Sequence, residues 1–310
     1  MSEICVVGSI NMDVVTYVDV FPIKGQTMYG EKVREFPGGK GANQAMSCAR
    51  HGKTITLIGA IGNDPYGNGL LQYLEDNHVD ISHIKEKSAK TGQTTIIADK
   101  QGENSIILLQ GANGELTPSD VTESIKSLST CKVMLAQMET PYETVLAAMK
   151  AAKEQGMFVI LDPAPADHVD DELLKHANLV LPNEHEAEMI TGIKITDDVS
   201  ATQAANIFKT KGVPNAILKV GSQGAYVFDG QYLSFVEGIK VNAIDAVGAG
   251  DSFAGAIASA LIDHQSLKTA AQHANIFAAL KVTKEGAQAG IPTLKEVIEF
   301  TKERKLSNYL

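Results

Sequence analysis

Residues 133–162, VMLAQMETPYETVLAAMKAAKEQGMFVILD, contain two short apolar runs separated by a segment with helical spacing. The runs Val133–Gln137 and Phe158–Asp162 are almost continuously apolar, which is typical of strands that are buried on both faces. Between them, apolar side chains recur at the spacing of one helix face: Val145, Ala148, Met149 and Ala152. A strand, a helix and a second strand in this order predict one unit of a parallel sheet.

The same alternation continues on both sides of this segment. Further buried strands are predicted at Ile4–Val7, Thr54–Ile61, Leu179–Pro182 and Ala216–Val220. A further helix face is predicted from Ala201, Ala204, Ala205 and Phe208. The sequence therefore predicts an α/β fold with a central, mostly parallel sheet and helices on both of its faces. We find no internal repeat and no linker-like change of composition, so we expect residues 1–310 to form a single domain.

Some predicted strands fall outside this alternation. Val14–Val20 and Met28–Phe36 follow the first strand with no helix between them. Thr91–Asp99 and Ser105–Gln110 flank the segment 100–103, which contains Gly102 and predicts a hairpin turn. We expect a small separate sheet that acts as a lid, with its strands within about 14–36 and 91–110. The alternative is that these strands extend the edge of the main sheet.

Composition and charge exclude several classes of protein. The chain has 310 residues, 44% of them hydrophobic, which is enough to bury a core without disulfides or metals. Lys and Arg number 27 against 37 Asp and Glu, so a basic surface for nucleic acid is not expected. Residues 1–13 lack the features of a signal peptide, and no apolar run approaches the roughly 20 residues of a membrane span. Cys5, Cys48 and Cys131 form no CxxC pair, which favours a reducing compartment; we expect a cytoplasmic protein with no membrane partner.

The glycine-rich segments do not match the two common nucleotide-binding motifs. A P-loop requires a hydroxyl residue after its Gly-Lys pair, but Gly39-Lys40 is followed by Gly41. A dinucleotide fingerprint requires GxGxxG, which neither residues 8–13 nor residues 248–253 supply. Both of the corresponding folds are therefore disfavoured.

The segment Asp245-Ala246-Val247-Gly248-Ala249-Gly250-Asp251 precedes a predicted helix whose apolar face includes Phe253 and Ile257. Small residues at 248–250 leave backbone N–H groups free to face a ligand, and the start of the helix favours an anion. Asp251 would there be either a base that accepts a proton from an attacking hydroxyl or a plain N-cap of the helix.

The segment Pro37-Gly38-Gly39-Lys40-Gly41-Ala42-Asn43-Gln44-Ala45 leads into a predicted helix that continues through Arg50. Its glycines allow close approach of a small polar ligand, and Asn43 offers both a donor and an acceptor. The alternative is a tight turn before a helix, with Lys40 in solvent.

Together, Gly38–Ala45 and Asp245–Phe253 resemble the two signatures of the ribokinase-like (phosphofructokinase-B) family of sugar kinases. Further segments match the same family in the same order: Gly8–Asp13, Gln137–Pro141, Asp162–Ala166, Pro182–Glu188 and Gly286–Gln288. The resemblance covers essentially the whole chain. It implies an ATP-dependent kinase that phosphorylates D-ribose at O5 to give D-ribose 5-phosphate. The alternatives are a kinase of the same family for deoxyribose, fructose or a nucleoside, and a non-catalytic sugar-binding regulator on the same fold.

The resemblance also implies roles for individual residues. Asp251 would be the catalytic base, and the backbone N–H groups of Gly248, Ala249 and Gly250 would stabilise the transferred phosphoryl group. The sugar would be held, beside Asp251, by Asn11, Asp13, Gly39, Lys40, Asn43 and Glu139. Asn11 is the residue at which members acting on deoxyribose differ. Read without the family, Asp13 could be a turn residue at a strand end, and Glu139 an acid at a helix start.

The nucleotide would be bound by Asn183, Glu186, Lys219, Gly221, Ser222, Gly224, Gly250 and Asn275. Lys219 stands where a threonine is common in the family. Glu186 would organise Mg²⁺ and phosphate through water. Read without the family, Glu184–Glu188 could be a metal cluster, but no second histidine has ligand spacing, and the run equally fits a solvated helix start.

Two further expectations follow from the resemblance. A monovalent cation, usually K⁺, would lie beside the anion cradle, held largely by carbonyl oxygens of Asp245, Val247, Lys281, Lys284, Gly286 and Gly290. Ala246 replaces a threonine that is frequent beside this site. The lid sheets of two subunits would pack together in a homodimer.

Overall fold

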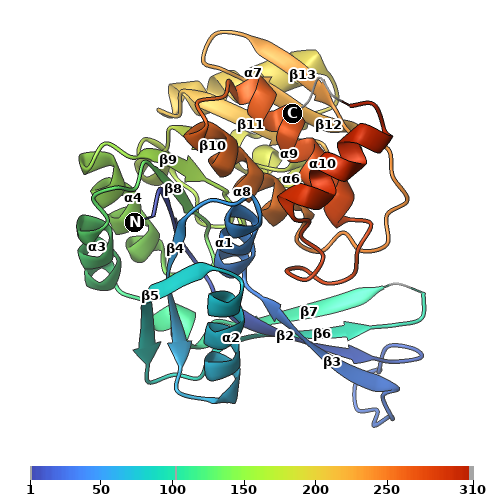
Figure 1. The fold of residues 1–310 in the computed structure, drawn as a ribbon. Helices are drawn as coiled ribbons and strands as arrows, with labels where there is room; N and C mark the ends of the chain where they lie inside the picture. Colours follow the sequence, from blue (N-terminus) through green and yellow to red (C-terminus); the bar gives the residue numbers. More distant parts are fainter. Residues whose placement is uncertain (1, 102, 307–310) are drawn as a thin grey trace.

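A nine-stranded sheet forms the centre of the computed structural model, which describes residues 2–101 and 103–306 (Figure 1). Its strands lie in the order β13 (Leu233–Glu237), β12 (Gly224–Phe228), β11 (Asn215–Lys219), β10 (Leu179–Val180), β9 (Phe158–Leu161), β8 (Val133–Ala136), β1 (Ile4–Val7), β4 (Ile55–Gly62) and β5 (Val79–Lys87). Neighbours from β11 to β5 pair in parallel, whereas β12 and β13 are antiparallel. The predicted, mostly parallel sheet is confirmed.

Helices cover both faces of this sheet, because successive side chains of a strand point to opposite faces. In β1, Ile4 and Val6 face one core, and Cys5 and Val7 face the other. The first core is closed by α1 (Lys40–Arg50), α2 (Pro65–Asp76), α8 (Ala249–Ile262), α9 (Leu267–Lys281) and α10 (Leu294–Glu303). The second is closed by α3 (Pro118–Ser127), α4 (Tyr142–Glu154), α5 (Asp171–Leu174), α6 (Glu184–Thr191) and α7 (Asp198–Thr210).

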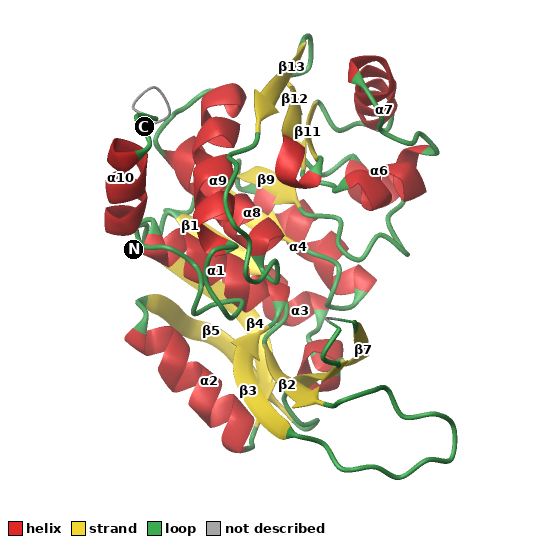
Figure 2. Ribbon diagram, turned by 90° about the vertical axis from the view of Figure 1, so that its right-hand side faces the viewer, coloured by secondary structure: helices red, strands yellow, loops and turns green. Residues whose placement is uncertain are grey.

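A separate four-stranded sheet projects from this body, as Figures 1 and 2 show. Its order is β3 (Lys32–Gly38), β2 (Asn11–Tyr17), β6 (Gly92–Ala98) and β7 (Asn104–Leu109). The expected second sheet is confirmed, and the alternative of edge strands on the main sheet is wrong. We call this second sheet the lid sheet.

The lid strands begin and end a few residues away from their predicted bounds. β2 starts at Asn11 and not at Val14, because the polar residues Asn11 and Asp13 pair in register with Gly38 and Phe36 of β3. Backbone pairing, not apolar composition, thus sets the start of the strand. Gly102, expected in the hairpin turn, lies outside the described residues.

The described part of the chain also contains two short 3-10 helices, η1 (Gly111–Glu115) and η2 (Gly221–Gln223). Within the described ranges, no helix combines the length and the apolar character that crossing a membrane requires.

Candidate active site

A cavity of about 1130 Å³ lies at the carboxyl ends of β9, β10 and β11. Ligands of open α/β sheets bind at this edge. The walls come from the start of α8, the middle of α9, the turn between β11 and β12, and Asn183 with Glu186 at the start of α6. Every residue expected to bind the nucleotide lines it: Asn183, Glu186, Lys219, Gly221, Ser222, Gly224, Gly250 and Asn275.

Asp251 lies on the wall of this cavity and is held by two side-chain amides. Asn43 Nδ2 donates to its Oδ2 atom at 2.8 Å, and Gln44 Nε2 donates to its Oδ1 atom at 3.1 Å. Both amides come from α1, which packs against α8. The N-cap of α8 is Gly248, in the left-handed conformation at φ 77, so the N-cap interpretation of Asp251 is wrong. The two amides orient this buried carboxylate, whose oxygens can accept a further hydrogen bond from a ligand hydroxyl.

The first turn of α8 presents backbone N–H groups to the cavity. Gly250 and Asp251 lie in this turn, where amides have no partner within the helix. The Ala249 amide, expected in the same cradle, donates to the Ala246 oxygen at 3.2 Å. The cradle is therefore formed most directly by the amides after Ala249, together with the positive end of the helix dipole.

Lys40 lies both at the wall of the cavity and beside Glu139, where a second cluster of polar residues begins. It is the first residue of α1, and its side chain lines the cavity, so the alternative that places it in solvent is wrong. Asp251 is the strongest of several carboxylates that raise the pKa of Lys40 above its ordinary value, and Glu139 acts in the same direction. A lysine surrounded by acids stays protonated and can bridge two anionic or hydroxyl-bearing ligands.

Glu139 joins the two segments that enclose the second cluster. Its Oε2 atom accepts hydrogen bonds from Ser9 Oγ at 2.5 Å and from the Lys40 amide at 3.3 Å. It does not cap α4, which begins after Pro141, so the interpretation as a helix-start acid is wrong. Burial raises the pKa of Glu139.

Asn11 and Asp13 project from the base of the lid sheet. Asn11 Oδ1 accepts a hydrogen bond from Asn113 Nδ2 at 2.7 Å. Asp13 lies within β2 and not in a turn, and burial raises its pKa to about 6, although a hydrogen bond from Thr94 opposes this shift. Its carboxylate lies over Gly38, where an added methyl group would come 2.2 Å from Oδ2.

Gly39 allows the chain to turn sharply beside this cluster. Its φ of 87 is in the left-handed region, and an added methyl group would lie 2.7 Å from the Asn11 amide nitrogen. Asn11, Asp13, Gly39, Lys40, Asn43 and Glu139, all expected to bind the sugar, are thus linked to one another or to Asp251 by close contacts or charge interactions. We call this group, together with Ser9 and Asn113, the polar cluster.

Asp162 connects Asp251 to the nucleotide side of the cavity. Lys219 Nζ lies 2.9 Å from Asp162 Oδ1, and Gln44 Nε2 donates to Asp162 Oδ2 at 2.8 Å as well as to Asp251. Lys219 Nζ also lies close to Gly250, since a methyl group added there would be 3.7 Å away. The lysine that replaces the family's threonine therefore places a positive charge beside the start of α8.

Glu186 and Asn183 form a reciprocal cap at the start of α6. Asn183 donates from its amide to Glu186 Oε2 at 2.7 Å, and Glu186 donates from its amide to Asn183 Oδ1 at 2.8 Å. Burial raises the pKa of Glu186, which lines the cavity. Glu184, His185 and Glu188 are exposed. Only Glu186 of this acidic run faces the cavity.

The residues expected to hold a monovalent cation meet beside the start of α8, but their arrangement does not fit the ion. Lys281 Nζ donates to the Asp245 carbonyl oxygen at 2.9 Å, so an ammonium group already bonds one of the oxygens expected to hold the cation. The Lys284 side chain turns away and pairs with Glu296. Burial lowers the pKa of Lys281, and the neighbouring Asp245 carboxylate opposes this shift.

The structure places in the site several residues for which no role was predicted. Gln44, Asp162, Gln137, Ser9 and Asn113 all bond to site residues or to the residues that hold them. Asp162 and Gln137 directly follow β9 and β8. A polar residue at the carboxyl end of a buried strand is a signal that could have identified both.

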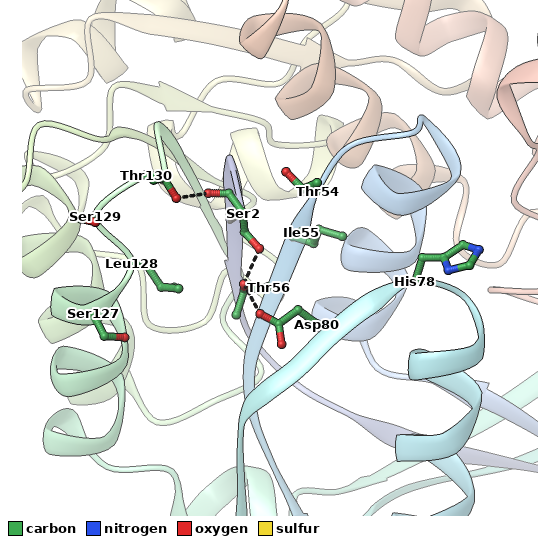
Figure 3. Close-up of a pocket in the computed structure, with 10 residues that line it drawn as sticks. All are labelled: Ser2, Thr54, Ile55, Thr56, His78, Asp80, Ser127, Leu128, Ser129 and Thr130. Carbon is green, nitrogen blue, oxygen red and sulfur yellow. Dashed lines mark hydrogen bonds between the residues drawn. The ribbon is translucent and has the colours of Figure 1, made fainter.

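A smaller cavity of about 410 Å³ lies at the opposite end of the sheet, where β1 and β4 begin (Figure 3). Its polar side chains bond protein groups nearby: Thr56 Oγ1 donates to Asp80 Oδ2 at 2.9 Å, and Thr130 Oγ1 donates to the Ser2 backbone carbonyl oxygen at 2.9 Å. Among the described residues that line it, Asp80 supplies a carboxylate, but no helix begins there to present free amides beside it. The larger cavity is therefore the candidate active site.

Comparison with known proteins identifies the family of this chain. Residues 1–294 match the pfkB family of carbohydrate kinases. The chain is 38% identical over 296 residues to a ribokinase of Haemophilus influenzae, covering 95% of this chain and 97% of that protein. It resembles the crystal structure of a ribokinase from Thermotoga maritima, with a TM-score of 0.89 and 36% identity over 97% of this chain and 100% of that one. It also resembles Arabidopsis thaliana ribokinase complexed with ribose and ATP, with a TM-score of 0.91 and 29% identity over 97% of this chain and 99% of that one.

Proposed function

Since the chain belongs to the pfkB family of carbohydrate kinases, we propose that it transfers the γ-phosphoryl group of ATP to O5 of D-ribose. The observation that carries this proposal is the position of Asp251. Its carboxylate lies between a cavity large enough for a nucleotide and a polar cluster suited to a sugar, and two amides from α1 hold it there.

The reaction needs little covalent chemistry from the protein. Asp251 accepts the proton of O5 while O5 bonds to the γ-phosphorus, and the bond from that phosphorus to the β–γ bridging oxygen breaks, so that ADP leaves. The amides at the start of α8 and the ammonium group of Lys219 lie where negative charge is transferred. The carboxylates of Glu186 and Asp162 on the cavity wall would hold Mg²⁺ bound with ATP, since Mg²⁺ prefers oxygen ligands and retains water, and the ion would neutralise phosphate charge.

The polar cluster would replace the water around the ribose hydroxyls. Carboxylates of Asp13 and Glu139 accept hydrogen bonds, while the amides of Asn11 and Asn43 can donate or accept them. Because Asn11 and Asp13 start a lid strand, movement of the lid sheet would change access to the sugar. We therefore propose that the lid sheet excludes water from the site, because water would otherwise compete with the sugar as acceptor of the phosphoryl group.

Several finer features belong to the same proposal. We propose one domain over residues 1–310 and a homodimer in which the lid sheets of two subunits pack together. The support for the dimer is β7, whose residues are all exposed although Ile106–Leu109 are apolar. We propose a cytoplasmic location, since the three cysteines are free thiols and the phosphate donor is ATP. The proposed reaction does not include the expected K⁺, because Lys281 bonds the Asp245 carbonyl oxygen that was expected to bind this ion.

The test is ADP release from Mg·ATP with D-ribose, 2-deoxyribose, D-fructose and adenosine. We expect ribose to give the highest kcat/KM, and Asp251→Asn to lower kcat by about 10²–10⁴-fold while a ribose-induced rise in melting temperature persists. The matched control is Glu143→Gln, an exposed acid in the first turn of α4, which should leave kcat unchanged.

The outcomes separate the alternatives. Higher kcat/KM with another acceptor would keep the mechanism and replace the substrate. A rise in melting temperature with ribose, but no ADP release with any acceptor, would favour the sugar-binding regulator.

A further inference from the structure

Lys281 is completely buried although it carries a charged group. It is the last residue of α9, and its side chain has no exposed surface. Lysine is almost never fully buried unless its ammonium group is paired. Here Nζ donates to the Asp245 carbonyl oxygen at 2.9 Å and lies 3.7 Å from the Asp245 carboxylate oxygen Oδ2.

Asp245 is the centre of a network that fixes the start of α8. Its Oδ1 atom accepts from the Val247 amide at 2.9 Å, and its Oδ2 atom accepts from the Gly286 amide at 2.8 Å. The Ile244 and Asp245 amides donate to the Val282 oxygen, one residue beyond Lys281. The turn 245–248 is thereby held against the end of α9, and this turn leads directly to Gly248 and Asp251.

Carbonyl groups expected to hold the cation lie near the end of the Lys281 side chain. A methyl group added at Gly290 would lie 3.1 Å from Lys281 Cε, 3.1 Å from the Lys284 oxygen and 2.6 Å from the Gly286 oxygen. The end of the Lys281 side chain and two of the carbonyl oxygens expected to hold the cation, those of Lys284 and Gly286, therefore lie around the same point beside Gly290. An ammonium group and K⁺ carry the same charge, so they would repel each other if both bound at the Asp245 oxygen.

We propose that the Lys281 ammonium group is a built-in replacement for the monovalent cation, so that this enzyme works without K⁺. The inference rests on the proposed kinase function for its activity readout only. Lys281 acts as a positioning residue: it neutralises the Asp245 oxygens and fixes the turn that carries the anion cradle, but it does not touch the reacting atoms.

The first experiment measures ADP release in chloride salts of K⁺, Na⁺, Cs⁺ and tetramethylammonium at constant ionic strength. We expect kcat/KM for the sugar to differ by less than about twofold between K⁺ and tetramethylammonium, which is too large for a carbonyl cage. Activation of the natural protein by K⁺ of about fivefold or more would overturn the proposal.

The second experiment removes the ammonium group. Lys281→Ala opens space for an ion, so we expect a loss of about tenfold or more in tetramethylammonium that K⁺ restores in large part. Lys281→Met retains the bulk without the charge, so we expect the same loss with no recovery in K⁺. Lys268→Ala, an exposed lysine on the same helix, is the matched control and should behave as the natural protein in every salt. Full activity of Lys281→Met in tetramethylammonium would contradict the proposal.

A third readout does not depend on turnover. Crystals soaked in thallium(I), a K⁺ substitute with strong anomalous scattering, should show no peak beside Asp245 in the natural protein and a peak there in Lys281→Ala. K⁺ should likewise raise the melting temperature of Lys281→Ala alone. A thallium peak beside Asp245 in the natural protein would overturn the proposal even if the variant fails to fold. The expected thallium pattern without turnover on any sugar would instead reject the proposed function and keep this inference.

Discussion

Asp13 and Asp251 are both acids of the site, but their surroundings give them different tasks. Asp251 receives hydrogen bonds from two amides of α1, which orient its carboxylate. Asp13 is instead buried and lies near the negative charges of Glu139 and Asp251. Burial, together with these charges, raises the pKa of Asp13 to about 6. Because that value is close to assay conditions, the protonation of Asp13 can be followed through sugar binding.

We predict that kcat/KM for the sugar falls by up to about tenfold per pH unit as the pH drops below about 6. The value of kcat/KM falls at low pH because Asp13 gains a proton there. Above its pKa, Asp13 is a carboxylate that accepts hydrogen bonds from two hydroxyls, and below its pKa the bound proton reduces its capacity to accept them. The measurement is kcat/KM for ribose between about pH 5 and 8, with ATP saturating.

Asp13→Asn is the variant that isolates this group. It should raise KM for ribose and remove the break in the profile near pH 6. Glu139 and Glu186 also have raised pKa values, so an unchanged break in the variant would assign the titration to one of them and contradict the prediction.

At the scale of helices, the contact between α1 and α8 connects stability to catalysis. Asn43 and Gln44 of α1 reach Asp251 only because the two helices approach closely at Gly255 of α8. A methyl group added at Gly255 would lie 2.4 Å from Ser47 Cβ and 2.9 Å from the Gln44 oxygen. The helices would have to separate to accommodate it.

We predict that Gly255→Ala lowers the free energy of unfolding by about 1–3 kcal/mol and also lowers kcat, because the amides that hold Asp251 shift with α1. The control is Gly69→Ala in α2, where an added methyl group meets nothing within 4 Å. Because Gly69 is exposed in a helix, Gly69→Ala should raise the free energy of unfolding by about 0.5–1 kcal/mol. Urea unfolding and kcat measure both effects, and a Gly255→Ala variant as stable and active as the natural protein would refute the role of this contact.

The helices and strands could be predicted largely because their signals are local. Apolar runs and the i, i+3, i+4 spacing lie within a few residues, so the ends of β8 and β9 were predicted within one residue, and the predicted helix face between them lies in α4. The start of β2 was predicted three residues too late. Asn11 and Asp13 belong to the strand because they pair with β3 and β6, and the sequence of β2 alone does not show this pairing.

The parts of the site that were missed depend on contacts between distant residues. Asn113 of η1 bonds Ile10 and Asn11, and Gln44 bonds both Asp162 and Asp251, but no periodicity joins these positions. The burial of Lys281 was not predicted either, since a lysine in the last turn of a helix usually interacts with the helix dipole from the surface. The two signature segments Gly38–Ala45 and Asp245–Phe253 do lie together in the structure, because α1 packs against α8 and Asn43 and Gln44 bond Asp251.

At the scale of the whole molecule, the lid sheet leaves an apolar strand without cover. Ile106, Ile107, Leu108 and Leu109 of β7 are 41–59% exposed, and β7 is an edge strand of the sheet. Successive strand residues point to opposite faces, so both faces of this edge are apolar. Exposed apolar edges of this kind are normally covered by another chain, which supports the proposed homodimer.

We predict that the natural protein is a dimer and that the double variant Ile106→Lys, Ile107→Lys is a monomer, because it places a charge on each face of the edge. Sedimentation velocity across a range of protein concentrations measures the change. The control is Val199→Lys, an apolar residue of α7 that is 66% exposed but lies outside the lid sheet, and it should remain dimeric.

The same variant tests whether assembly matters for catalysis. Asn11 and Asp13 stand at the base of the sheet whose far edge would be held by the partner, so a lid without a partner should close less firmly over the sugar. We therefore expect KM for ribose to rise several-fold in the monomer while KM for ATP changes little, because the nucleotide cavity takes none of its walls from the lid sheet. A monomeric variant with unchanged KM for ribose would separate the lid's closure from assembly, and a natural protein that sediments as a monomer would remove the dimer altogether.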